Sequence, residues 1–401
     1  MKKLNKMFFF FVFFMFSVSA YPFTFFEKIN SKYIGVCLAT QVNRVGAPTE
    51  LPSGHIALLI KGACLDPNYA FPQLKECDKK QNQNQHVLVS VNPFIKNVNW
   101  LATEGFEKIF NGHLSPNQTL NDENFKLTFE KMANSSPFKG VEFHQTKYEK
   151  TLNSKLDFAK TVLGYDSAMN FGRETWCAKI PINNLVLNRV IGFLNKQNKK
   201  IIENHETFNY DFFNDNCAHL VHNTLSEIGF ESPIDVRVPF YRKLFNISIP
   251  GNEFLAAVDQ VSGYKIKLSE PKKIFKNPQL LEVFNEMNWL PIQPFFEIEK
   301  RDLIKPNQLF NGDLKITFLD ITWNWFSSKK RFDTYLNETP KNNPLNQVKL
   351  ARFEYDSALD TVEKEMSLTK NSNSDDNYHT FLKKYKDYLN DQSKLISTSL
   401  F

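Results

Sequence analysis

Residues 52–61 read Pro-Ser-Gly-His-Ile-Ala-Leu-Leu-Ile-Lys, and this stretch decides the fold. The Pro-Ser-Gly sequence is a turn signal, and the apolar, partly β-branched run after it predicts a strand that begins at His55. A histidine at the first position of a strand is held rigidly at one end of the sheet. We therefore take His55 as a candidate functional residue.

Residues 86–92, His-Val-Leu-Val-Ser-Val-Asn, have the alternation of a second strand. Side chains alternate between the two faces of a strand, so His86, Leu88, Ser90 and Asn92 share one face and the valines share the other. The composition predicts further strands at 33–40 and 176–182 and helices at 152–163, 184–195 and 217–228. A basic turn is expected at 196–200.

The N-terminus has the layout of a secretory signal peptide over residues 1–20. Lys2, Lys3 and Lys6 precede an apolar run, and Val-Ser-Ala at 18–20 offers a cleavage site. Export to a periplasm of the Gram-negative type, or secretion, is expected. Removal of the three lysines lowers the net charge from +6 to near +3, which is too weak to indicate nucleic acid binding. This charge is compatible with contact to an anionic membrane surface.

Two regions are expected after the signal peptide: a thiol-enzyme domain at 21–250 and a mostly helical region at 251–401. The second region is rich in Phe, Trp, Lys and Pro. A Ser- and Asn-rich linker is expected at 366–377, followed by an amphipathic helix at 378–396. The predicted fold class is α+β, with an antiparallel sheet and a helix that is capped in front of a cysteine.

The five cysteines are an odd number, so an exported monomer keeps at least one free thiol. The pairing that we predict joins Cys64 to Cys77 across a short loop and Cys37 to Cys177. This pairing, one of three that four cysteines allow, leaves Cys217 free.

Cys217 follows Asn214-Asp215-Asn216 and opens an apolar-periodic helix that Gly229 ends. Asn or Asp before a helix caps its first turn. The positive end of the helix dipole favours a thiolate at this position, and the N–H groups of the first turn are ready donors for an oxyanion. Cys217 is therefore the candidate nucleophile.

His55 is the candidate general base. A third polar group should orient its imidazole ring, and His86 and Asn92 are the candidates because they share a face of the next strand. Spacing alone does not choose between them. No metal or other cofactor is expected.

Other roles are open for these residues. Taken alone, Cys217 fits a buried structural cysteine, and His55 fits a core or turn histidine. His219 and His222 have the spacing of a zinc-binding pair, but they lie away from the apolar stripe. This position favours a solvated helix face over a metal site.

The residues around the candidate dyad resemble a known family, the Lnb-type N-terminal periplasmic domain family. Residues 53–58 resemble its Gly-His strand, and Tyr210 to Ala218 resembles its motif of a tyrosine followed by Asn-Cys-Thr. Ala218 stands where the family has threonine. The resemblance covers residues 45–245 and implies a permuted papain-like, NlpC-type fold. Asn216, Ala218 and Tyr210 are then expected to support the nucleophile.

The resemblance also implies acyl transfer on lipoproteins, in which an O-acyl chain moves to an N-terminal amine through a thioester on Cys217. The expected function is thus a cysteine-dependent acyltransferase or lipid-ester hydrolase that acts on a lipid-modified protein. A cell-wall amidase or peptidase of the NlpC type and a non-enzymatic secreted module remain as alternatives.

Overall fold

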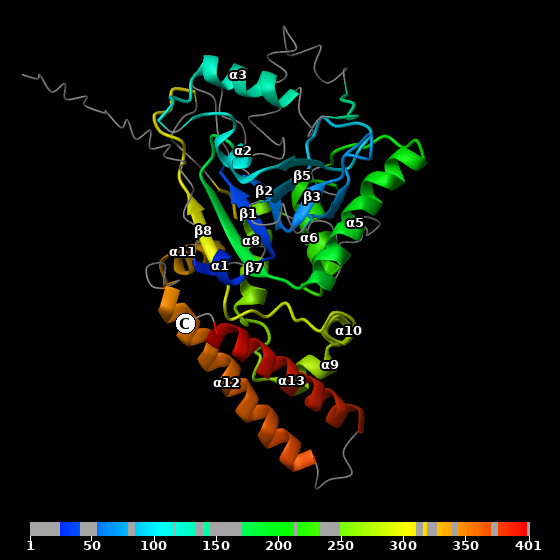
Figure 1. The fold of residues 1–401 in the computed structure, drawn as a ribbon, viewed down its shortest axis with the longest axis vertical. Coiled ribbons are helices and arrows are strands. Elements are labelled where there is room, and N and C mark those ends of the chain that lie inside the picture. The colour runs from blue at the N-terminus through cyan, green and yellow to red at the C-terminus, as the bar shows by residue number, and fades with distance from the viewer. Residues whose placement is uncertain are drawn as a thin grey trace, which may run out of the picture.

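The run after His55 forms β2 (His55–Lys61), a central strand of a six-stranded antiparallel sheet in the computed structural model (Figure 1). The strand order is β6-β5-β2-β1-β7-β8. The other five strands are β1 (Tyr33–Ala39), β5 (His86–Ser90), β6 (Leu101–Glu104), β7 (Thr175–Pro181) and β8 (Glu297–Arg301). The fold is therefore α+β, as predicted, and its sheet is antiparallel.

The structure describes residues 25–40, 54–78, 85–115, 117–133, 139–144, 170–211, 215–231, 249–309, 316–318, 327–338, 344–369 and 376–398. The signal peptide expected at 1–20 and the helix expected at 152–163 lie outside these residues. No helix among the described residues has both the length and the apolar character needed to cross a membrane.

Every residue of β1 and β2 is buried, so both faces of the sheet are covered. Alternation separates the side chains of β2 into two sets. Ile56, Leu58 and Ile60 point to what we call the first face, and Ala57 and Leu59 point to the second face. The side chains of β5 alternate as predicted, with the valines on the first face and Leu88 on the second.

Three helices pack on the first face: α5 (Asn184–Glu203), α6 (Cys217–Ser226) and α8 (Pro250–Val261). The basic turn expected at 196–200 is wrong, because α5 continues through it. Asn198 lies on the buried side of α5, where its amide accepts the N–H groups of Asn99 and Trp100 and donates to the carbonyl of Pro72. The lysines of this segment are simply the solvent side of a longer helix.

The second face packs against α1 (Phe25–Ile29), α2 (Phe106–Asn111) and the C-terminal helices. These helices are α9 (Pro271–Lys276), α10 (Pro278–Met287), α12 (Pro344–Thr369) and α13 (Asp376–Thr398). Helices α12 and α13 lie side by side as a hairpin, and α9 and α10 lie between this hairpin and the sheet (Figure 1). Two further helices, α3 (Asp122–Ala133) and α11 (Ser327–Glu338), and a small hairpin of β3 (Ala63–Leu65) and β4 (Leu74–Glu76) complete the described elements.

Strand β8 belongs to the expected helical region, yet it pairs with β7 at the edge of the sheet. The sheet thus crosses the boundary expected at residue 250, and the two sides of that boundary share both core clusters. The rest of the described C-terminal region is mostly helical, as predicted.

Both predicted disulfides are present. Cys37 and Cys177 lie directly opposite each other on β1 and β7, with Cα atoms 4.0 Å apart. Cys64 and Cys77 close the β3–β4 hairpin. Cysteines bridge in this way in proteins that fold in an oxidising compartment, which agrees with export.

A buried lysine holds α1 and β8 to the sheet. The side chain of Lys179 is 0% exposed, and its Nζ lies 2.8 Å from Glu27, 2.6 Å from Glu299 and 3.5 Å from Glu297. The Tyr33 hydroxyl donates to the same Glu27 carboxylate at 2.8 Å. Burial alone would raise the pKa of Glu27, but the charge of Lys179 and the hydrogen bonds from Lys179 and Tyr33 lower it to about 2.

We predict that Glu27→Gln lowers the free energy of unfolding by roughly 2–3 kcal/mol at pH 7, because the depressed pKa measures a favourable interaction of the ionised carboxylate. That contribution is complete above the ordinary pKa near 4.5 and is lost as the pH falls toward 2. Urea unfolding of the wild type and the variant from pH 7 to pH 2.5 should show that the difference between their free energies of unfolding shrinks below pH 4.5. The exposed Glu123→Gln serves as the control, and a difference that stays constant with pH would contradict the account.

Candidate functional site

Cys217 is the first residue of α6, and it is the one cysteine outside a disulfide, since all five lie in the described residues. Asn216 caps the helix as predicted: its Oδ1 accepts the N–H of Ala218 at 2.8 Å and of His219 at 3.1 Å. The N–H of Ala218, which was expected to serve an oxyanion, is therefore used by the cap. The thiol is buried against the first-face core, at the positive end of the helix dipole.

The chain before α6 fixes where the thiol lies along the sheet. The N–H of Phe208 donates to the carbonyl of Lys96, and the hydrogen bond from the Asn99 side chain reaches Asp215. Residues 92–99 follow the end of β5, and antiparallel pairing places that end beside the start of β2. The thiol and His55 thus belong to the same end of the sheet.

The contacts at the C-terminal end of α6 show in which direction the helix runs along the sheet. The Gln279 side chain of α10 donates to the carbonyl of Ser226, the last residue of α6, and to the carbonyl of Glu231 just beyond it. Helix α10 ends near Pro181, because the indole of Trp289 donates to the Pro181 carbonyl. Pro181 pairs with Tyr33 at the opposite end of the sheet from His55. Helix α6 therefore runs from the His55 end toward the Tyr33 end.

His55 is buried at the first position of β2, and its Nε2 lies 2.8 Å from Ser90 Oγ. Strand alternation places its imidazole on the second face, with Ala57 and Leu59, whereas Cys217 packs on the first face. Among the described residues, Cys217 makes no hydrogen bond to His55. A contact between the two groups has to be made around the end of β2 and not across one face.

The two residues expected to orient His55 lie at different ends of β5. His86 pairs with Lys61 at the far end of β2, where its Nε2 lies 2.7 Å from the Tyr33 hydroxyl. Asn92 is opposite His55 when the register of β2 and β5 is extended by three residues beyond the pair Leu58–Val89, and its Oδ1 accepts the N–H of Phe94. His86 is therefore too distant to orient His55, and Asn92 is at the correct end.

The expected solvent exposure of the two histidines of α6 is wrong. His219 and His222 were expected on a solvated face, but both are buried, because α8 covers that side of α6. The Nδ1 of His222 lies 2.9 Å from the Glu253 carboxylate of α8. Tyr210, the expected supporting residue at the start of the motif, is partly buried against the first-face core.

Asp215, two residues before Cys217, is a titratable group of the site that sequence reasoning did not single out. Burial raises the pKa of its carboxyl to about 6, the hydrogen bond from Asn99 lowers the pKa, and the neighbouring Asp211 raises it. Asp211 and Asp215 are joined by two backbone hydrogen bonds of 3.0 and 2.9 Å. The pair of acids four residues apart in front of the cysteine was the signal available in the sequence.

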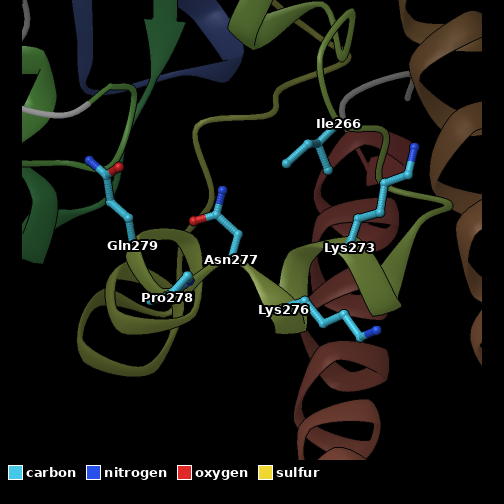
Figure 2. A pocket seen from close by; sticks show the side chains of 6 residues that line it. All are labelled: Ile266, Lys273, Lys276, Asn277, Pro278 and Gln279. Atoms are coloured by element: carbon cyan, nitrogen blue, oxygen red, sulfur yellow. The ribbon is translucent and has the colours of Figure 1, made fainter.

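A groove of about 690 Å³ lies away from these residues, between α9 and the start of α10 (Figure 2). Its lining residues are Ile266, Lys273, Lys276, Asn277, Pro278 and Gln279. Gln279 also contacts the end of α6 that is distant from Cys217. None of the predicted site residues lines this groove, so its shape says nothing about the chemistry of the thiol.

Comparisons of the chain with family models, with curated proteins and with solved structures give no match. The functional argument therefore depends on the geometry of the site and on the sequence motifs.

We predict that Asp215→Asn increases the free energy of unfolding at pH 7 by roughly 1–3 kcal/mol. A raised carboxyl pKa means that the folded protein binds the proton more tightly than the unfolded chain. Wild-type stability relative to the variant should therefore fall as the pH rises from about 4 to about 6. Urea unfolding at pH 4, 5, 6 and 7 measures this, with the exposed Asp122→Asn as the control. Equal stability of wild type and variant at every pH would contradict the buried carboxyl.

Proposed function

We propose that the protein is an exported cysteine-dependent acyltransferase or lipid-ester hydrolase, with Cys217 as nucleophile and His55 as base. One observation carries the proposal: the single unpaired thiol opens a capped helix, at the same end of the sheet as a buried histidine. The first turn of a helix presents backbone N–H groups to a developing oxyanion, and a thiol nucleophile needs a base nearby.

The proposed reaction has two steps. The Cys217 sulfur gives its proton to the His55 imidazole and attacks an ester carbonyl, which forms a thioester and releases the alcohol with that proton. Water or an amine then attacks the thioester, and the thiol regains a proton. The N–H of Cys217 itself, at the first position of α6, is the backbone donor available for the oxyanion, because the next two N–H groups serve the Asn216 cap.

The choice of an acyl ester as substrate depends on the resemblance of residues 53–58 and 210–218 to the Lnb-type N-terminal periplasmic domain family. A permuted papain-like arrangement is part of the proposal, and its support is that the histidine strand precedes the cysteine helix in the chain and that both reach one end of the sheet. Periplasmic location is part of this proposal, and the two disulfides support export.

We predict that incubation with a diacylated lipopeptide adds the mass of one acyl chain to the wild-type protein and none to Cys217→Ala. His55→Ala should slow formation of this adduct by about 10²–10⁴-fold, the usual contribution of a general base. Intact-mass spectrometry over time, followed by peptide mapping of the modified residue, makes both measurements.

Peptidoglycan fragments tested in parallel separate acyl chemistry from the amidase alternative. Hydrolysis of the fragments without a lipid adduct would replace the proposal by that alternative. The absence of any Cys217 adduct or product with either substrate, in a protein that is folded by circular dichroism, would contradict thiol catalysis.

A further inference from the structure

The groove between α9 and the start of α10 lies beside a short basic segment of the chain, residues 265–276. This segment has one acid, Glu270, and five lysines: Lys265, Lys267, Lys272, Lys273 and Lys276. Its net charge of +4 exceeds the net charge of near +3 that is expected for the whole exported chain. The positive charge of the protein is therefore concentrated at this groove.

The lysine side chains of the segment are available to an anion. Lys267, Lys272 and Lys276 form no ion pair with the residues that the structure describes. Lys265 pairs with Glu231, and Lys273 pairs with Glu270, but these two lysine side chains are 46% and 63% exposed. Ion pairs between exposed side chains contribute little to stability, so a ligand can replace these carboxylates at low cost.

Asn277 adds a hydrogen-bond donor of fixed direction. Its Oδ1 caps α10 by accepting the N–H of Leu280 at 3.1 Å. The amide nitrogen keeps two N–H donors, and no residue in the described part of the chain accepts them. Figure 2 shows Asn277 and Gln279 on one side of the groove and Lys273 and Lys276 on the other. An anion between these sides can meet a neutral donor and two cations.

The remaining lining indicates a ligand that is larger than a bare anion. Ile266, which packs against the second-face core, and Pro278 give the groove an apolar part. The volume of about 690 Å³ is that of a site for a small organic ligand. The occupant that fits has an anionic group toward Lys273, Lys276 and Asn277 and an apolar group toward Ile266. Phosphate suits the anionic end, because its several oxygens accept from lysine and from neutral donors at once.

We propose that the groove binds a phosphate ester with an apolar substituent, the chemistry that a phospholipid headgroup presents at a membrane surface. A soluble phosphate ester offers the same chemistry. Tyr264, directly before the basic segment, is 69% exposed and favours the membrane as the source, because tyrosine rings prefer the membrane–water interface. The proposal is independent of the thiol chemistry, since Gln279 contacts the end of α6 that is distant from Cys217.

The first test is a titration of the purified protein with sn-glycerol 3-phosphate and, separately, with a short-chain phosphatidylglycerol. The readout is the side-chain amide signal of Asn277 in ¹H–¹⁵N spectra. Asn277→Ser, which retains a capping oxygen for α10, assigns this signal by its loss. We expect a shift that saturates, with phosphatidylglycerol binding more tightly than the soluble ester.

The second test is sedimentation with vesicles of phosphatidylcholine, with and without phosphatidylglycerol. Binding is expected only with phosphatidylglycerol, and added salt should weaken it by screening the exposed charges. Each lysine near an anionic membrane contributes about fivefold to binding, so Lys273→Gln/Lys276→Gln should weaken it roughly 25-fold. The control Lys196→Gln/Lys200→Gln removes the same charge from the exposed side of α5 and should have little effect.

A third variant tests the groove without removing a lysine. Asn277→Asp keeps an oxygen that can cap α10 but replaces the amide donor by a negative charge. It should weaken binding to phosphatidylglycerol vesicles by more than the loss of one lysine, hence by more than about fivefold. Asn346→Asp adds the same charge at the exposed start of α12 and is the matched control.

The two readouts decide separate parts of the proposal. An Asn277 signal that moves with neither phosphate ester overturns the binding site, because the lysines then act only as a charged surface. A signal that moves, together with vesicle binding that is lost in the groove variants, supports the site with lipid as its source. A signal that moves with glycerol phosphate while vesicle binding is absent, or equal in the groove variants and their controls, supports the site with a soluble ester as its source.

Discussion

The burial of β1 and β2 on both faces is the constraint on which the rest of the structure depends. A strand that is apolar on alternate sides can leave one face in water, but these two strands have no exposed residue. Two separate layers must therefore cover the sheet. Helices α5, α6 and α8 form one layer, and the described N-terminal and C-terminal helices form the other. The C-terminal region is consequently part of the same core and not an appended module.

The same constraint divides the polar side chains between the two ends of the second face. Lys179, Glu27, Tyr33 and His86 meet at one end, where paired charges offset the cost of their burial. His55 and Ser90 meet at the other end, where His55 Nε2 lies 2.8 Å from Ser90 Oγ. The first group holds α1 to the sheet. His55 and Ser90 lie at the end of the sheet where the segment before Cys217 contacts the residues that follow β5. Two histidines on neighbouring strands thus have different surroundings.

The sequence was sufficient where local signals were strong. Turn residues and β-branched alternation located β1, β2, β5 and β7, and Asn216 before an apolar period located the start of α6. The odd number of cysteines indicated one free thiol, and the pairing chosen among the three that four cysteines allow is the one that the structure has. The contact between His55 and Ser90 could not be predicted, because the register between β2 and β5 is set by the whole sheet. The burial of His219 and His222 was missed because it depends on α8, which begins more than twenty residues later. Strand β8 was missed because an edge strand with four charged residues lacks the apolar pattern of the central strands.

The charges of β8 bear on whether the molecule self-associates through this edge of the sheet. The outermost strand of a sheet offers unpaired N–H and carbonyl groups to any extended chain that approaches. Strand β8 reads Glu-Ile-Glu-Lys-Arg, and Lys300 is engaged by Glu174 and Asp302. A chain that adds to this edge would have to desolvate these charges and separate their pairs. The edge of the sheet thus discourages self-association by the same acidic and basic residues that tie β8 to its neighbours.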